Sequence, residues 1–263
     1  MSKVRVRVCT ALLLVGIVQQ YANASAQLIV DLRRTSFDVS VSDSGGSLNP
    51  TASDMATNPQ ETFVGSAISG TVSTEVVDAQ ASGLASQTSN YSSAGRSGSP
   101  LLFDVFHATG RAIAEASGQT NEADASGYAE THVRIFFSLG TPHAYSITGM
   151  LTEEHRSDGA FAFATSEAFA SIGDSNHVME EATGPGPVDL SGVLEPGDYK
   201  LEFKATSDVD VLEVGSANSS TSFQDMVFDL TEVPEPATGV MLLIGALVAL
   251  RRGQRRRSEF SRN

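Results

Sequence analysis

The sequence predicts an all-β protein, either an antiparallel β-sandwich or a jelly roll. Three observations support this prediction. Apolar and polar residues alternate with period two in several segments, and turn residues separate these segments. No segment carries a sustained apolar stripe with the 3.6-residue period of a helix. Small residues are abundant and aromatic residues make up only 7% of the chain, which suits strands and turns better than packed helices.

Five segments show the alternation clearly. Their apolar positions are Phe37, Val39 and Val41; Val133, Ile135, Phe137 and Leu139; Tyr199, Leu201 and Phe203; Val209 and Val211; and Met226, Phe228 and Leu230. Each segment predicts a strand with one buried and one wet face, as in antiparallel sheets. We also expect Phe161, Phe163 and Phe169 in the core, and Phe136 on a polar face.

Turn residues divide the strands. Gly184–Pro187 and Glu195–Asp198 are strong breakers, and Gly140-Thr141-Pro142 ends the strand that contains Val133. We expect a loop from Asp43 to about Asn58.

Three other segments are harder to interpret. The stretch from Ala108 to Ala125 fits a strand at least as well as a helix, because Gly110 and Gly118 disfavour a long helix. Residues 79–99 have few apolar anchors and predict either a loose loop or a pair of edge strands. The ionisable cluster at residues 153–156 predicts a solvated hairpin turn.

The N-terminus has the three parts of a secretory signal. Basic residues come first, a short apolar run from Cys9 to Val18 follows, and Ala24-Ser25-Ala26 then gives the small-x-small pattern that signal peptidase recognises. We predict a signal peptide at 1–26 that forms a short N-terminal helix, with cleavage after Ala26, and after Ala24 as the second choice. The alternative is an N-terminal membrane anchor, but the apolar run is short for one. Removal of the signal takes Cys9, so no disulfide or thiolate site is expected in the mature chain.

The C-terminus has an ordered three-part pattern. Pro234-Glu235-Pro236 is followed by 14 apolar or small residues from Ala237 to Leu250. A cluster of basic residues comes next, comprising Arg251, Arg252, Arg255, Arg256 and Arg257. A helix of that length reaches only about 21 Å, against about 30 Å of hydrocarbon in a bilayer. This predicts a segment held only briefly in the membrane, with the arginines in the cytoplasm.

This pattern, from Val233 through Pro234, Glu235 and Pro236 to the arginines, closely resembles the PEP-CTERM family of sorting signals. The resemblance implies recognition by exosortase, a membrane processing enzyme of Gram-negative bacteria. It also implies a route from transient inner-membrane anchoring to the cell surface or medium, and a link to extracellular polysaccharide or biofilm. Gly253-Gln254 interrupts the arginines and departs from the pattern. The alternative is an ordinary C-terminal membrane helix.

The expected organisation therefore has four parts: a signal at 1–26, a β-sandwich ectodomain at 27–232, a sorting signal at 233–257 and a cytoplasmic tail at 258–263. Residues Ser191 to Tyr199 resemble a G-x-L-x-P-G-x-Y hairpin of extracellular β-sandwiches found upstream of such tails. That second resemblance concerns the fold alone.

The net charge of the expected ectodomain limits the classes of molecule that it can bind. Between Gln27 and Val233 there are eight Lys and Arg against 29 Asp and Glu, a net charge of −21. Such a domain repels nucleic acid and anionic membranes, so we expect neither as a partner.

Catalytic patterns are missing from the sequence. It has no Gly-x-Ser-x-Gly, no His-Glu-x-x-His and no phosphate-binding glycine loop. We therefore expect no enzyme activity and no cofactor. A structural calcium ion is considered at two pairs of carboxylates, Asp208 with Asp210 and Asp225 with Asp229, although no calcium loop is present.

Three hypotheses follow for the ectodomain. The preferred one is a structural or interaction protein of the surface or matrix. The first alternative is a carbohydrate-binding module, for which the candidate stacking residues are Tyr91, Tyr128 and Tyr145 since Trp is absent. The second is a polysaccharide hydrolase, which requires two carboxylates facing each other in a cleft.

Overall fold

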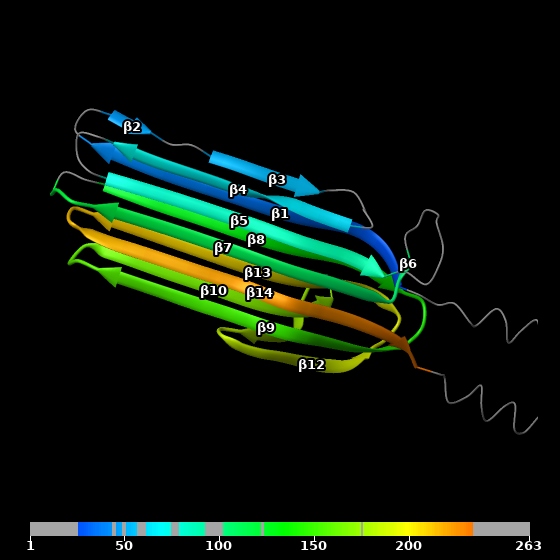
Figure 1. Ribbon diagram of the computed structural model, residues 1–263. Coiled ribbons are helices and arrows are strands. Elements are labelled where there is room, and N and C mark those ends of the chain that lie inside the picture. Colours follow the sequence, from blue (N-terminus) through cyan, green and yellow to red (C-terminus); the bar gives the residue numbers. More distant parts are fainter. Residues whose placement is uncertain are drawn as a thin grey trace, which may run out of the picture.

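The computed structural model describes residues 26–43, 46–48, 51–56, 62–74, 79–92, 102–121, 124–174 and 176–233. In these residues the protein is all-β, as predicted, and its long antiparallel strands form two sheets stacked face to face (Figure 1). No helix in the described ranges is long and apolar enough to cross a membrane. The two expected terminal helices lie outside those ranges.

The first sheet has eight strands in the order β11-β10-β13-β8-β1-β2, and β3 and β6 also pair with β1. The short strands β6, β3 and β2 follow one another along the edge of β1 that faces away from β8. The bounds are β1 Ala26–Asp43, β2 Gly46–Leu48, β3 Thr51–Ala56, β6 Leu102–Phe103, β8 Asp124–Leu139, β10 Ala162–Asp174, β11 Val178–Thr183 and β13 Gly197–Leu212.

The second sheet has six strands in the order β12-β9-β14-β7-β5-β4. Its bounds are β4 Thr62–Thr74, β5 Ala79–Ser92, β7 Val105–Gly118, β9 His143–Asp158, β12 Gly186–Leu194 and β14 Gly215–Glu232.

Consecutive long strands mostly lie in opposite sheets. The chain alternates between the two sheets from β7 to β10, and again from β11 to β14. The breaker at Pro196 therefore carries the chain from one sheet to the other, whereas the expected hairpin would have joined two strands of one sheet. The Tyr199 hydroxyl closes this connection by donating to the Glu195 carbonyl oxygen at 2.6 Å.

The apolar residues predicted from alternation are confirmed as core residues. All five apolar sets, from Phe37 to Leu230, are buried between the sheets. They divide into two clusters. An aromatic-rich cluster lies toward the end where β1 begins and β14 ends, and an alanine-rich cluster lies toward the opposite end.

The two sheets come very close together in the alanine-rich half. A Cβ atom added to Gly127 on β8 would lie 3.1 Å from the Ser82 carbonyl oxygen on β5 of the other sheet. A Cβ atom on Gly83 would lie 3.1 Å from the Phe37 Cβ atom. Glycine is therefore required at these two positions, and alanine takes most of the other inner positions of this half.

This spacing explains why the expectation for Phe161 and Phe163 was wrong. Both are exposed, at 47% and 56%, while Ala162 takes the neighbouring inward position. Phe169, also expected in the core, faces outward and is half-buried. Phe136 is half-buried too, and its place on the polar face is confirmed. An inward phenylalanine near Ala162 would push the sheets apart.

Three predictions about loops and turns were also wrong. Residues 79–92 form one strand, β5, which has β7 and β4 on its two sides and is not at an edge. The expected loop after Asp43 contains β2 and β3. The cluster Glu153–Arg156 lies within β9, where a Glu153 carboxylate oxygen accepts the Ala168 backbone N–H at 2.7 Å. The stretch from Ala108 is confirmed as a strand, β7.

A buried ion pair lies on the inner face of β1. Arg33 and Asp31 are both fully buried and joined by a 2.5 Å contact. The guanidinium also donates to the Ser89 carbonyl and hydroxyl oxygens at 3.3 and 3.2 Å, and it lies over the Tyr91 ring. Burial outweighs the attraction of Arg33 and raises the pKa of Asp31.

We predict that Arg33→Met destabilises the fold by about 3–5 kcal/mol, because it leaves the Asp31 carboxylate in the core without its cation. The double variant Asp31→Leu, Arg33→Met should recover most of that loss, since an apolar pair needs no compensation. Urea unfolding of the single and double variants measures both effects. A double variant as unstable as Arg33→Met would contradict this account of the pair.

Candidate functional site

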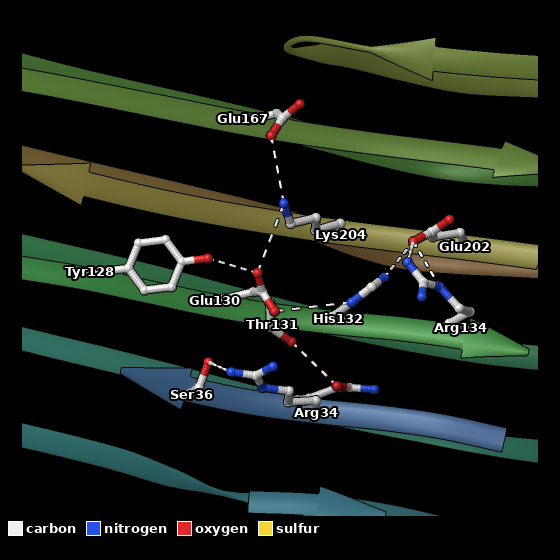
Figure 2. Close-up of polar contacts among 11 residues, drawn as sticks. Arg34, Ser36, Tyr128, Glu130, Thr131, His132, Arg134, Glu167, Glu202 and Lys204 are labelled. Atoms are coloured by element: carbon white, nitrogen blue, oxygen red, sulfur yellow. Dashed lines mark hydrogen bonds and ion pairs between the residues drawn. The ribbon is translucent and has the colours of Figure 1, made fainter. Parts of the chain in front are cut away.

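Charged side chains gather on the outer face of the first sheet, across β1, β8, β13 and β10 (Figure 2). Four of the eight Lys and Arg between residues 27 and 233 lie there, in a domain that is otherwise strongly acidic. We call this the charged face; its members are Arg34, Tyr128, Glu130, His132, Arg134, Glu167, Lys200, Glu202 and Lys204. It holds four permanent cations and three carboxylates.

Strand register explains why these residues meet. On β8 the even-numbered residues point outward because the odd-numbered ones are buried, and the same holds for β13 and for β1 from Asp31 onward. His132 lies opposite Arg34 on one side and Lys204 on the other. Three basic groups therefore occupy adjacent strands, which are about 4.8 Å apart in a sheet.

Glu202 is the centre of the first group of contacts. Its Oε1 atom accepts from His132 Nε2 at 2.6 Å and from Arg134 Nη2 at 2.6 Å, and Lys200 Nζ lies 2.9 Å from Oε2. Burial alone would raise the pKa of Glu202, but the hydrogen bonds from His132, Lys200 and Arg134 outweigh burial and hold the pKa well below its usual range.

Glu130 joins a second group of contacts to the first. Its Oε2 atom accepts from the Tyr128 hydroxyl at 2.7 Å and lies 3.8 Å from Lys204 Nζ. Its Oε1 atom lies 4.0 Å from His132 Nδ1, and Lys204 also faces Glu167 at 3.8 Å. The contacts hold the Tyr128 ring in one orientation.

A hollow of about 400 Å³ borders the charged face, above β1 and between β8 and β3. We call it the β1 hollow. Its lining comprises Arg34, Ser36, Phe37, Asp38, Thr51, Ser53 and Tyr128. These residues include one cation, one carboxylate, three Ser or Thr hydroxyl groups and two aromatic residues, Phe37 and Tyr128.

The β1 hollow differs from the two-carboxylate cleft expected of a glycoside hydrolase. Asp38 is the one carboxylate among its lining residues. The lining side chains present hydrogen-bond donors and acceptors as well as an aromatic ring, that of Tyr128.

The predicted calcium pairs are placed as follows. Asp208 and Asp210 share the outer face of β13 as expected, and burial, with Asp124 and Asp208 nearby, raises the pKa of Asp210. Asp225 has a φ of 49° in a bulge of β14 that separates it in register from Asp229. Within the described ranges, no group of three His, Cys, Asp or Glu is arranged to hold a metal ion.

Most predicted processing residues lie outside the described ranges, namely Ala24, Pro234, Glu235, Pro236 and Arg251 to Arg257. Two lie inside. Val233 follows the last strand, and its backbone N–H donates to the Pro142 carbonyl oxygen at 2.9 Å. Ala26 begins β1, is fully buried and pairs with Phe103.

The three candidate stacking tyrosines differ in how far their side chains are buried. Tyr91 and Tyr145 are buried in the core at 8% and 5% exposure, so their rings face other protein groups. Tyr128 is half-buried and lines the β1 hollow. Arg34 and Asp38, which line the hollow beside it, were not predicted as its companions. Their outward alternation with Phe37 and Val39 was visible, but their position beside Tyr128 depends on strand register.

Comparisons with known proteins place the chain in no family. No protein-family model matches it, and no curated protein matches it. One solved structure, the enzymatically active domain of bacteriophage CBA120 tailspike protein 4, is similar at 10% identity with a TM-score of 0.20. That match covers 62% of this chain and 19% of the tailspike chain, and a likeness so weak carries no argument.

We predict that Glu202→Gln lowers the free energy of unfolding by about 2 kcal/mol at pH 7, because charge-assisted hydrogen bonds are lost. The lowered pKa means that Glu202 stabilises the fold above its ordinary pKa of 4.5 and loses this effect as the pH falls. The difference between wild type and variant should therefore shrink at pH 3.

Urea unfolding at both pH values provides the measurement. The matched control is Glu167→Gln, which removes an exposed carboxylate at 3.8 Å from Lys204 and should cost much less. An equal deficit for Glu202→Gln at pH 7 and pH 3 would rule out the proposed ionic contribution.

Proposed function

We propose that this chain is an exported cell-surface or matrix protein that an exosortase-type enzyme sorts through its C-terminal tail. The observation that carries the proposal is the ordered pattern of Pro234-Glu235-Pro236, short apolar run and arginine cluster. The N-terminal signal pattern supports export. The partners would be signal peptidase, the sorting enzyme and extracellular polysaccharide.

The position of the last strand supports a cut at the Pro-Glu-Pro motif. Strand β14 ends at Glu232, and Val233 makes the last backbone hydrogen bond described before Pro234. Cleavage beyond Val233 would leave every described strand in place. The two prolines fix φ and cannot donate backbone hydrogen bonds, which keeps the motif suited to binding by a processing enzyme.

The burial of Ala26 bears on the N-terminal cut. Cleavage after Ala26 would remove a fully buried residue that pairs with Phe103, whereas cleavage after Ala24 would retain it. We therefore favour the earlier site, after Ala24, over our first expectation.

The two chain ends would present the domain in a definite direction. Strand β1 begins and β14 ends at the same end of the sandwich (Figure 1). While the tail is held in the membrane, the alanine-rich end would thus be the part farthest from the bilayer.

We predict that replacing Pro234, Glu235 and Pro236 together by alanine leaves the chain unprocessed in the inner membrane, because the motif for the sorting enzyme is lost. Immunoblots of membrane, envelope and medium fractions from a host with an exosortase system measure this. The matched control is Thr238→Ala, which changes one small residue of the apolar run, leaves the Pro-Glu-Pro motif intact and should be processed normally. Release of the triple-alanine variant at the wild-type level would contradict the sorting proposal.

We further predict that the mature N-terminus is Ser25, so that Ala26 stays in the core. Mass spectrometry of the intact protein recovered from envelope and medium defines both mature ends. A mature chain that begins at Gln27 would show that the sandwich forms without Ala26 and would restore the later cleavage site.

A further inference from the structure

The β1 hollow has the volume of a small-ligand site, and most of its lining residues are polar. Its volume of about 400 Å³ lies within the range of about 300–1,000 Å³ that is usual for such sites. Ser36, Thr51 and Ser53 line it with hydroxyl groups, which can both donate and accept hydrogen bonds.

Tyr128 offers the hollow an aromatic ring that is already held in place. Its hydroxyl donates to Glu130 at 2.7 Å, and Glu130 is in turn held near Lys204 and His132. Figure 2 shows the ring beside Glu130 on β8, with Arg34 and Ser36 on the neighbouring strand. A ring fixed before binding loses little conformational entropy when a ligand packs on it.

Arg34 and Asp38 place opposite charges at two positions of the same strand. Both are exposed, and Arg34 Nη2 donates to the Ser36 hydroxyl at 3.3 Å. That bond uses one of the five N–H donors of the guanidinium, so the group can still donate to ligand oxygens. Asp38 can accept hydrogen bonds from ligand hydroxyl groups. The two charges cancel within the hollow.

We infer that the β1 hollow binds an uncharged sugar unit of a polysaccharide, with its C–H face on Tyr128 and its hydroxyl groups on Arg34, Asp38 and the three hydroxyl side chains. A neutral glycan suits the balanced charges of the lining. A polyanion does not, because the domain as a whole carries a net charge of −21.

This inference takes from the proposed function only its polysaccharide environment, and it assigns the residues that contact the glycan. Binding by the purified protein does not require tail processing. A failure of binding therefore leaves the sorting proposal intact, and a failure of sorting leaves the binding result intact.

The test is affinity electrophoresis of the full-length protein in a polyoxyethylene detergent, which carries no sugar. Gels contain dextran, galactomannan or mannan as neutral polymers, and polygalacturonate as the anionic one. We expect retardation by at least one neutral polymer and none by polygalacturonate. Tyr128→Ala should weaken binding about tenfold or more, since a central aromatic contact is lost.

Two further variants keep the test interpretable if Tyr128→Ala folds poorly. Ser53→Lys places a long side chain over the hollow from an exposed position on β3, and it should abolish retardation. Arg34→Ala should weaken binding, whereas the matched control Arg111→Ala removes an exposed arginine from the outer face of the second sheet and should not. Thermal unfolding checks that each variant is folded.

The inference is overturned if no neutral polymer retards the wild-type protein, or if folded Ser53→Lys binds as the wild type does. Preferential binding of polygalacturonate that is lost with Arg34→Ala would also overturn it, by showing that the ligand is an acidic glycan.

Discussion

The close approach of the two sheets at one end is the constraint on which the rest of the structure depends. At Gly127, the Ser82 carbonyl oxygen of the other sheet leaves no room for a side chain. Alanine therefore fills most inner positions of that half, and the aromatic residues of the core, except Phe37, gather in the other half. The same spacing turns Phe161 and Phe163 outward.

The alternation of apolar and polar residues allowed much of the fold to be predicted from the sequence. Strands such as Val133–Leu139 and Tyr199–Phe203 carry large apolar residues at every second position, so their buried face was evident. The pattern fails for β5, whose inward residues include Ala79, Ala81 and Gly83; their small size resembles that of a loop but reflects the narrow gap between the sheets. Local pattern also cannot say which sheet a strand joins, and so the link at Pro196 was assigned to a hairpin.

The candidate site was less accessible to sequence reasoning than the fold. Tyr128 was recognised as an aromatic candidate, but Arg34 and Asp38 lie about ninety positions earlier in the chain. They become neighbours only through the pairing of β1 with β8. Glu202 likewise gains two of its three partners, His132 and Arg134, from the pairing of β13 with β8, and only Lys200 lies in its own segment. Long-range pairing is the information that a single sequence does not carry.

The place of β14 has a consequence for how the chain acquires its shape. This strand is the last in the sequence, yet it lies between β9 and β7 in the middle of the second sheet. Until residues 215–232 have been synthesised, β9 and β7 have no common neighbour and the second sheet is split. The contacts that close it join distant parts of the chain, which makes folding slow. A chain that lacks β14 therefore cannot complete the second sheet or the core cluster to which Phe223, Met226, Phe228 and Leu230 belong.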